Sequence, residues 1–316
     1  MKKIAWGTSK LLEMYLVEAG KDHFSYYIDD FSSKKEFLGI ERRHSSVLRK
    51  EKKGSYKIIV FAVSNRSLQE ISIKLNDLGL EYGKDFIYYS DFFYQNFVKK
   101  IKRDLGVKID PKIYQFAFSF TLNSRSLLHT TILGSWLFLE LIKQVDKLKG
   151  QIAEVGAYEG GNSLCALNFM TYLNSKRFYI LDSFEGFPEL NINDPKEHKK
   201  GDYNIKVSFN EIKDRFFIFP QAKLLKDFVP ASFKRIPKNE KFSLVFYDCD
   251  LYQPALDTFK FFWPRIVRGG YLIIHDYKTE AGGFTGVKKA TDQFFADKKI
   301  KLVSFFENTM AVIKKP

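Results

Sequence analysis

The first ninety residues alternate short apolar runs with stretches whose apolar positions recur at helical spacing. We expect helices at TSKLLEMYLVEAG and at NRSLQEISIKLNDLGL, the second capped by Asn65 or Ser67 and closing near Gly79. The apolar runs predict strands within KKIAWG, FSYYIDD, YKIIVFAVS and DFIYYS. This order of strands and helices predicts a small open parallel sheet, a Rossmann-like α/β domain, over residues 1–95.

A mostly helical region separates this alternation from a second one. YSDFFYQNFVKKIKRDL and SLLHTTILGSWLFLELIKQVDKLKG both have amphipathic helical character. We therefore expect residues 96–150 to link two domains and to cover one end of the second sheet. The polar segment TLNSRSLLH between them is a candidate for a loop that reaches the active site.

The second alternation occupies residues 151–316 and predicts a larger doubly wound α/β sheet. Its first strand ends at Glu154, and a glycine-rich turn leads into a helix that begins near Asn162 or Ser163. Further strands are predicted within KRFYILDSFEGFP, AKLLKDFVPASFKRI, FSLVF and GGYLIIHDY. DLYQPALDTFKFFWPRI predicts a helix with Pro254 in its first turn.

Composition favours a globular protein of two domains. The 316 residues exceed the usual size of one domain, and 45% hydrophobic residues supply large cores. The chain start lacks the apolar core of a signal peptide, and the longest apolar run, TTILGSWLFLELI, is shorter than the roughly 20 residues that span a bilayer and contains Glu140. Cys165 and Cys249 make no paired disulfide framework. We expect a soluble, cytoplasmic protein without stable membrane insertion.

The net charge of +14, from 51 Lys and Arg against 37 Asp and Glu, favours anionic partners. Nucleic acid, acidic membrane surfaces and phosphorylated or nucleotide-linked substrates all fit this charge. The densest basic runs, ERRHSSVLRKEKK and KKIKR, belong to no recognisable nucleic-acid module, so we interpret them as solvated faces. An anionic or sugar small molecule is the expected partner, and nucleic acid is not.

The turn after the first strand, WGTSKLL, contains one glycine. Dinucleotide-binding turns carry Gly-x-Gly-x-x-Gly so that the backbone can approach a pyrophosphate, and we therefore expect no tightly held dinucleotide here. Gly7, Thr8 and Ser9 either cradle a smaller anion or form a tight turn with a hydroxyl cap. The domain resembles the small Rossmann-like domain often attached to bacterial sugar-modifying enzymes, which implies docking, homo-oligomerisation or substrate presentation.

Two features of the second alternation indicate a ligand at the ends of its strands. Gly156 permits a tight turn against a ligand, while Gly160 and Gly161 let backbone N–H groups meet an oxygen at the positive end of a helix. Asp182 ends the next strand, where doubly wound folds hold ribose hydroxyls with a carboxylate.

The stretch YDCDLYQPALD ends an apolar strand on two aspartates. Asp248 and Asp250 share a side of an extended chain, and paired carboxylates repel each other unless a cation or a proton neutralises them. GGYLIIHDY delivers His275 and Asp276 to the end of another strand. The alternatives are a helix cap with a surface charge for the aspartates and a hydrogen-bonded strand end for His275.

Four motifs occur in order: EVGAYEGG, DSFEGFP, DCDLY and GGYLIIHDY. The first two resemble class I S-adenosylmethionine-dependent methyltransferases. The full set resembles the macrocin O-methyltransferase family, metal-dependent enzymes that methylate sugar hydroxyls on antibiotics and related products, over approximately residues 120–316. The resemblance implies that these residues hold S-adenosylmethionine: Glu154, Gly156, Tyr158, Gly160, Gly161, Ser163, Asp182, Ser183, Phe184, Asp227, Phe228 and Asp248. Asp227 and Phe228 are expected at the adenine ring, with a helix cap as the alternative for Asp227.

The same resemblance implies a divalent cation held by Asp248, His275 and Asp276. Carboxylates favour Mg²⁺, the first expectation, with Mn²⁺ as its alternative. The imidazole of His275, which stands where relatives more often have a second aspartate, suits Mn²⁺, Fe²⁺ or Zn²⁺ better than Mg²⁺. Asp250 is the candidate catalytic base. His275 is an alternative base, or it supports another ligand.

The expected acceptor is a sugar hydroxyl of a nucleotide-linked or glycan precursor, as in polysaccharide biosynthesis, which suits the basic balance. A methyltransferase acting on a catechol-like diol and a non-catalytic scaffold of the same fold are the alternatives. The aromatic residues beside the motifs are expected to be walls of the donor pocket or core packing: Tyr158, Phe184, Tyr252 and Tyr277.

Overall fold

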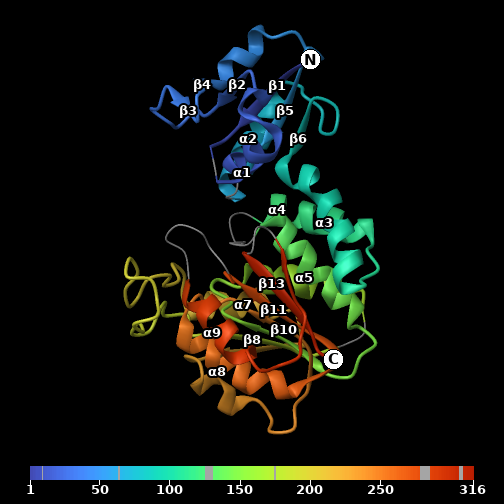
Figure 1. Ribbon diagram of the computed structural model, residues 1–316, viewed down its shortest axis with the longest axis vertical. Coiled ribbons are helices and arrows are strands. Elements are labelled where there is room, and N and C mark those ends of the chain that lie inside the picture. The colour runs from blue at the N-terminus through green and yellow to red at the C-terminus, as the bar shows by residue number, and fades with distance from the viewer. Residues whose placement is uncertain (9, 63–64, 125–130, 174–175, 278–284, 306–308) are drawn as a thin grey trace. The chain divides into compact units, whose positions relative to one another are not determined.

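The computed structural model describes the chain apart from residues 9, 63–64, 125–130, 174–175, 278–284 and 306–308 (Figure 1). The described residues divide into two compact units. The first unit comprises Met1–Lys99 and Thr121–Thr131, and the second comprises Lys100–Phe120 and Ile132–Pro316. Among the described residues, no helix is both long enough and apolar enough to cross a membrane.

The first unit contains a six-stranded, mostly parallel sheet. Its strands, in sheet order, are β3 (Glu36–Phe37), β4 (Ile40–Arg43), β2 (Tyr26–Ile28), β1 (Lys2–Trp6), β5 (Tyr56–Val60) and β6 (Phe86–Tyr88). All neighbouring pairs are parallel except β3 and β4. The four strands expected from apolar runs are confirmed. The pattern misses β3 and β4 because Ile40 is their only buried residue, so no apolar run marks them.

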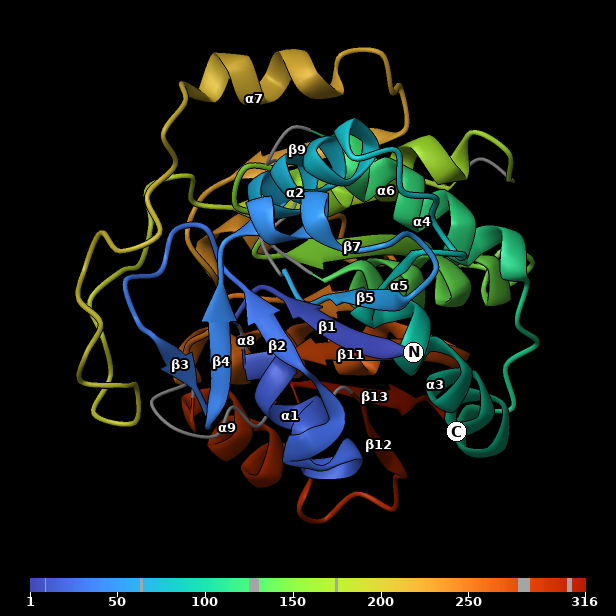
Figure 2. The ribbon, with the colours of Figure 1, turned by 90° about the horizontal axis from the view of Figure 1, so that it is seen from above.

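Two helices connect the parallel strands of this sheet. α1 (Lys10–Ala19) follows β1, and α2 (Asn65–Asp77) follows β5, on opposite faces of the sheet (Figure 2). The short 3₁₀ helices are η1 (Lys21–His23) and η2 (Ser45–Lys50). Because helices cover both faces, all three residues of β2 are buried. The basic run at residues 41–53 forms β4 and η2, and Leu48 is the one buried residue of η2.

Three helices occupy the predicted helical region. α3 (Tyr89–Leu105) matches the predicted stretch, whereas α4 (Pro111–Asn123) was not expected. α5 (Ile132–Gln144) is buried on every side from Ile132 to Ile142, so it is a buried helix and not the amphipathic one that its sequence suggested. Of the candidate loop TLNSRSLLH, the first three residues complete α4 and residues 125–130 lie outside the described part of the chain.

The second unit contains a seven-stranded sheet. Its strands, in sheet order, are β12 (Leu302–Phe305), β13 (Met310–Lys314), β11 (Ile266–His275), β10 (Phe242–Tyr247), β7 (Gln151–Val155), β8 (Phe178–Asp182) and β9 (Ala222–Lys226). The five strands from β11 to β9 are parallel, and β13 is antiparallel to both of its neighbours. The prediction of a doubly wound α/β sheet is confirmed.

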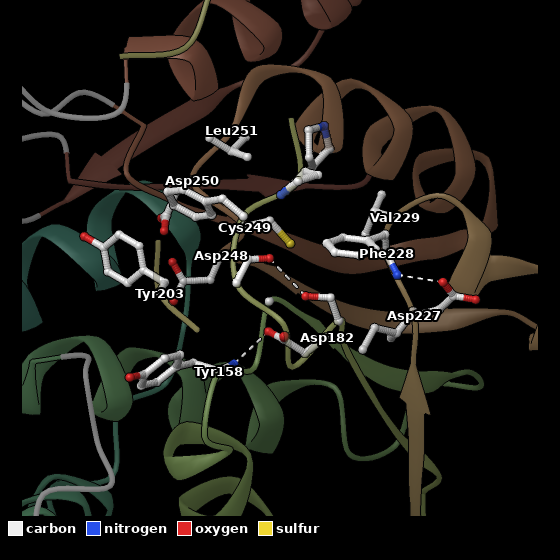
Figure 3. Close-up of a pocket in the computed structure, with 17 residues that line it drawn as sticks. Tyr158, Asp182, Tyr203, Asp227, Phe228, Val229, Asp248, Cys249, Asp250 and Leu251 are labelled. Carbon is white, nitrogen blue, oxygen red and sulfur yellow. Dashed lines mark hydrogen bonds between the residues drawn. The ribbon is translucent and has the colours of Figure 1, made fainter. Parts of the chain in front are cut away.

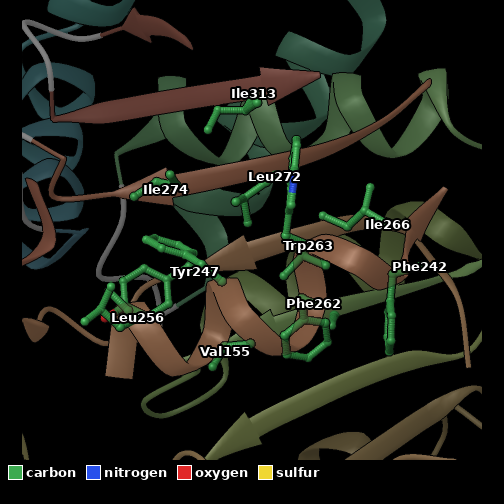
Figure 4. Close-up of a cluster of buried hydrophobic side chains, with 14 of the residues drawn as sticks. Val155, Phe242, Tyr247, Leu256, Phe262, Trp263, Ile266, Leu272, Ile274 and Ile313 are labelled. Carbon is green, nitrogen blue, oxygen red and sulfur yellow. The ribbon is translucent and has the colours of Figure 1, made fainter. Parts of the chain in front are cut away.

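Helices cover both faces of this sheet. In chain order they are α6 (Gly161–Met170), α7 (Phe209–Phe216), η3 (Ala231–Arg235), α8 (Tyr252–Phe262), η4 (Trp263–Arg265) and α9 (Thr285–Phe295). A buried cluster joins β7, β10 and β11 to α8, with Tyr247, Phe262 and Leu272 near its middle (Figure 4). The chain builds outward from β7 to β8 and β9, then returns to place β10 on the other side of β7. Ligands of such sheets bind where the strand order reverses, at the carboxyl ends of the strands.

Candidate active site

A cavity of about 100 Å³ lies at the carboxyl ends of β7, β8, β9 and β10 (Figure 3). It therefore sits at the point where the strand order of the second sheet reverses. Eight of the residues that the sequence proposed for a site line it: Gly156, Tyr158, Asp182, Ser183, Asp227, Phe228, Asp248 and Asp250.

Gly156 brings two strand ends into contact. Its φ is 92°, and a Cβ built on it would lie 2.1 Å from the backbone O of Asp248. The N–H of Gly156 donates to the carbonyl of Leu181, and the N–H of Asp248 donates to the carbonyl of Val155. Only glycine fits this turn, and its close packing fixes where the ends of β7, β8 and β10 meet.

The carboxyl of Glu154, a residue predicted to contact S-adenosylmethionine, is hydrogen-bonded to side chains of α6. This carboxyl is buried and does not line the cavity; it accepts hydrogen bonds from Asn162 Nδ2, at 2.8 Å, and from Ser163 Oγ. Burial raises the pKa of Glu154 to about 8, and these two hydrogen bonds oppose that rise. Glu154 thus fastens the first turn of α6 to β7.

Gly160 and Gly161 likewise shape the turn and do not line the cavity. Gly160 precedes α6 in the left-handed conformation, and a Cβ on it would lie 2.5 Å from Cζ of Phe216. Gly161 is the first residue of α6 and is buried. The glycines therefore allow α6 and α7 to pack closely beside the strand ends.

Asp182 lies at the wall of the cavity, at the end of β8. Its Oδ2 accepts the N–H of Tyr158 at 2.8 Å, and its Oδ1 accepts the N–H of Phe184 at 2.6 Å. Burial raises the pKa of Asp182, while the backbone hydrogen bonds act to lower it. A carboxylate has about four lone-pair sites, so Asp182 retains capacity to accept ligand hydroxyls.

The neighbours of Asp182 divide between the cavity and the core. Ser183 donates its hydroxyl to the carbonyl of Gly186 at 3.1 Å and lines the cavity. Phe184, with a φ of 56°, packs against Phe209 at a ring-centroid distance of 5.2 Å and does not line the cavity. The expectation of core packing for Phe184 is therefore met.

Asp227 and Phe228 both line the cavity beyond β9. The N–H of Asp227 donates to the carbonyl of Asp182 at 3.0 Å, and Asp227 Oδ1 accepts the N–H of Phe228 at 2.9 Å. The next helix, η3, has Pro230 at its N-cap. Asp227 is consequently not a cap of that helix.

Four ionisable side chains meet at the ends of β10 and β11. Asp248, Asp250, His275 and Asp276 each offer a ligand atom, and these four atoms lie within 4.8 Å of one another. His275 Nδ1 is 2.8 Å from Asp248 Oδ1 and 2.7 Å from Asp276 Oδ2. Asp250 and Asp276 have backbone φ values of 62° and 52°, which residues other than glycine rarely adopt. Strained backbone of this kind is common at functional sites.

The electrostatics of this acidic cluster reflect the crowding of its carboxylates. Burial and the negative charges of Asp276 and Asp248 raise the pKa of Asp250 well above its usual value. Burial acts to lower the pKa of His275, but the adjacent carboxylates outweigh burial and raise it. Burial acts to raise the pKa of Asp276, yet His275 holds it below the usual value. Three hard carboxylates and one imidazole in this radius fit a divalent cation.

Comparison with known proteins places the chain in a family. Residues 138–310 match the family model described as Macrocin-O-methyltransferase (TylF). The chain belongs to the macrocin O-methyltransferase family. The match covers most of the second unit and none of β1 to β6.

Two relatives show the extent of the likeness. The chain is 28% identical over 153 residues to the 8-demethyl-8-(2,3-dimethoxy-alpha-L-rhamnosyl)-tetracenomycin-C 4'-O-methyltransferase of Streptomyces olivaceus, covering 43% of this chain and 56% of the relative. It is 27% identical over 144 residues to the mycinamicin III 3''-O-methyltransferase of Micromonospora griseorubida, covering 42% and 57%. The chain thus spans little more than half the length of these relatives.

Two solved structures share the fold. The O-methyltransferase NovP superimposes with a TM-score of 0.54 at 19% identity, over 61% of this chain and 83% of that one. The calicheamicin methyltransferase CalS11 gives 0.52 at 16% identity, over 67% and 96%. At these low identities, both similarities show a shared fold.

In this member of the macrocin O-methyltransferase family, Asp194 caps α8. Leu251 is the N-cap residue and makes no side-chain cap, while Asp194 Oδ1 accepts the N–H of Tyr252 at 2.7 Å. The alternative that Asp248 and Asp250 serve as the helix cap is thereby not supported. Sequence reasoning missed Asp194 because it lies 58 positions before the N–H that it accepts.

Tyr203 is a second residue that sequence reasoning missed. It lines the cavity with a φ of 59°, and burial together with the charges of Asp250 and Asp276 raises the pKa of its hydroxyl. Figure 3 shows it on the same side of the cavity as Asp250. The signal for it was the stretch at residues 187–208, which has no periodicity and exceeds an ordinary connection in length.

Tyr252 and Tyr277 do not line the cavity. Tyr252 donates its hydroxyl to Gln293, and Tyr277 donates its hydroxyl to Asp292 at 3.2 Å, both on α9. These two tyrosines therefore anchor α9. Tyr158, in contrast, is the wall residue that was expected.

Proposed function

We propose that this chain transfers a methyl group from S-adenosylmethionine to a hydroxyl of a sugar. The observation that carries the proposal is the acidic cluster at the ends of β10 and β11, two members of which, Asp248 and Asp250, line the cavity. Membership of the macrocin O-methyltransferase family supports it, and so do the O-methyltransferase names of the relatives. Catalysis is assigned to the second unit, with its core in residues 151–316.

The cavity suits a positively charged donor. S-adenosylmethionine supplies an electrophilic methyl group on a cationic sulfur. Asp182, Asp227 and Asp248 place carboxylates around the cavity, and backbone contacts at Gly156 hold the strand ends that shape it. In our proposal Asp182 accepts ribose hydroxyls, and Phe228 contacts the adenine ring.

The acidic cluster suits activation of the acceptor. Asp248, His275 and Asp276 are the residues that would hold a divalent cation, Mg²⁺ or Mn²⁺, and this ion would lower the pKa of a sugar hydroxyl beside it. Asp250 Oδ then accepts the hydroxyl proton as the oxygen attacks the methyl carbon.

The acceptor that we propose is a nucleotide-linked sugar or a glycan precursor. The net charge of +14 favours an anionic partner through long-range attraction. Tyr203 and the segment around it lie beside Asp250, where an acceptor would have to bind. A role in polysaccharide or natural-product modification follows from this choice of acceptor.

Formation of S-adenosylhomocysteine tests the proposal. The purified chain is incubated with S-adenosylmethionine, with nucleotide sugars, free sugars, glycans or catechols, and with EDTA or a defined metal. We expect turnover with a sugar acceptor that EDTA abolishes, and loss of that turnover in Asp248→Ala and Asp276→Ala with partial recovery at high metal concentration. Turnover by Asp248→Ala in EDTA would refute the metal assignment. Turnover with catechols alone would refute the sugar assignment.

A further inference from the structure

The first unit has its own cavity at the carboxyl edge of its sheet. The cavity has a volume of about 260 Å³ and lies at the ends of β1, β2 and β5, beside α2. The chain passes from β1 outward to β2 and then returns to place β5 on the other side of β1, so the strand order reverses here. This edge is where open parallel sheets bind ligands.

Thr8 and Asp29 form a pair of hydrogen-bond acceptors in this cavity. Asp29 Oδ1 accepts the N–H groups of Phe31 and Ser32, both at 3.0 Å, so the chain fixes the orientation of its carboxylate. The Thr8 hydroxyl donates to Asp29 Oδ2 at 2.7 Å. The Thr8 oxygen keeps lone pairs, and Asp29 Oδ2 keeps one. Two adjacent acceptors suit a ligand with two adjacent O–H donors.

The charges at the cavity favour a neutral ligand over an anion. Asp30 is paired with Lys74, whose Nζ lies 2.5 Å from Asp30 Oδ2, and it also accepts the N–H and hydroxyl of Ser45. With Lys74 engaged in this way, the Asp29 carboxylate is the charge that a ligand beside Thr8 would meet. A phosphate placed there would be repelled by this carboxylate, whereas sugar hydroxyls would donate to it.

An exposed aromatic ring completes the site. Phe31 lines the cavity although its side chain is 81% exposed, and Lys74 Nζ lies 5.5 Å from the ring centroid. A large apolar side chain so exposed beside a cavity offers a surface on which a base or a sugar ring can stack. The cavity is smaller than the roughly 300–1,000 Å³ typical of pockets for larger ligands, so it fits one nucleoside or one sugar.

We propose that this cavity binds a ring with vicinal hydroxyls, the ribose of a nucleoside, with its diol donating to Thr8 and Asp29 and its base stacked on Phe31. A free monosaccharide would present the same diol, and the experiment separates the two sources. The proposal concerns residues of the first unit only, so it stands or falls separately from methyl transfer.

Calorimetry of the full chain, saturated with S-adenosylhomocysteine, tests the proposal. The probes are uridine, adenosine, their 2'-deoxy forms, NAD and glucose. We expect one site per chain for a ribonucleoside and an affinity about 10- to 100-fold lower for its 2'-deoxy form, because a hydrogen bond to a charged acceptor is lost. Saturable binding of glucose alone would assign the diol site to a monosaccharide. Binding of none of the probes, equal affinity for deoxy and ribo forms, or much tighter binding of NAD would overturn the proposal.

Variants locate the binding. Asp29→Asn replaces the free acceptor with a donor while its remaining oxygen can still accept the two N–H groups, and Phe31→Ala removes the ring. We expect a loss of about 10- to 100-fold in ribonucleoside affinity for the first and about 5- to 100-fold for the second. Asp22→Asn, at an exposed position in η1, is the matched control and should leave the affinity unchanged. Unchanged affinity in Asp29→Asn, with a native melting temperature, would refute the site.

Discussion

The first strand of each sheet runs into the same kind of glycine turn, and the two turns differ in how closely they are packed. Gly7 follows β1 with a φ of 97°, and Gly156 follows β7 with a φ of 92°. A Cβ on Gly7 would lie 3.3 Å from the backbone N of Ala62, whereas a Cβ on Gly156 would lie 2.1 Å from the backbone O of Asp248. The second turn is therefore packed more closely than the first against the end of the neighbouring strand.

The strand on the far side of each turn carries different chemistry. β5 continues into Phe61 and Ala62, whereas β10 continues into Asp248 and Asp250. Both units therefore have a mainly parallel sheet whose strand order reverses, and this reversal provides a place for a ligand in each. The few residues after β5 and β10 decide whether that side of the cavity is apolar or carries carboxylates.

The largest expected effect would come from removing the proposed base, which has no counterpart in the first sheet. Asp250→Asn keeps the shape of the side chain, and asparagine tolerates the positive φ of this position. We expect turnover to fall about 10²- to 10⁴-fold, the usual contribution of a positioned base, with unchanged affinity for S-adenosylhomocysteine. Steady-state kinetics and calorimetry measure the two quantities.

Asp257→Asn, on α8 and outside the cavity, is the matched control for this change. It should leave turnover near that of the unaltered protein. Normal turnover of Asp250→Asn would show that another group accepts the hydroxyl proton, and His275 would be the next residue to test.

The two glycine turns can be compared directly by the same substitution. Gly7→Ala should cost about 1–3 kcal/mol of local stability, the price of a positive φ in a residue with a Cβ. Gly156→Ala carries that cost and must also displace the backbone of Asp248, so we expect about 2–6 kcal/mol. Hydrogen exchange of peptides from β1 and β7 reports each loss separately. Equal losses would show that backbone conformation, and not the packing of strand ends, sets the cost.

The sequence was informative where a strand ends on a polar residue. The continuous apolar runs before Asp182 and Asp248 predicted buried strands, and the end of each run indicated that its aspartate lies at the carboxyl edge of the sheet. The role of Gly156 could also be predicted, because a tight turn had to follow the strand that ends near Glu154. The five parallel strands of the second sheet, and the aspartates at the ends of β8 and β10, were accordingly predictable.

The sequence was uninformative where a contact joins distant segments. Asp194 caps a helix 58 residues later, and no local pattern records that pairing. Glu154 belongs to a motif, but the donors at Asn162 and Ser163 decide that its carboxyl turns away from the cavity. β3 and β4 have too few buried residues to leave a pattern. The direction in which a side chain points and its partners in distant segments depend on tertiary packing, which the hydrophobic pattern of the sequence does not record.

Asp182 is the last residue of β8, and Asp29 directly follows β2, so each lies at the carboxyl end of the second strand of its unit. In Asp182→Asn the amide keeps one oxygen where the carboxylate has two, so fewer ligand hydroxyls can be accepted. We expect affinity for S-adenosylhomocysteine to fall by about 1.5–3 kcal/mol, measured by calorimetry. Asp214→Asn, exposed on α7, is the matched control.

A donor analogue sharpens this test. If Asp182 accepts a ribose hydroxyl, the Asp182→Asn variant should bind S-adenosylhomocysteine and its 2'-deoxy analogue with almost equal affinity. The variant and the analogue each remove the same hydrogen bond, so the second change costs little once the first has been made. Additive losses would place Asp182 outside the ribose contact.

The two first strands also differ two residues before their glycines, where β7 has Glu154 and β1 has Ala5. Burial raises the pKa of Glu154 from 4.5 to about 8, so between these values the folded chain keeps a proton that the unfolded chain has released. The contribution of this group to stability is therefore fully present below pH 4.5 and is lost as pH rises to about 8, by up to about 1.4 kcal/mol per pH unit. Glu154→Gln removes this slope, whereas Glu197→Gln, at an exposed position, should keep it. Urea unfolding from pH 5 to 8, followed by the fluorescence of Trp136 and Trp263 in a Trp6→Phe background, reports the second unit alone, and an unchanged slope in Glu154→Gln would assign the pH dependence to other groups.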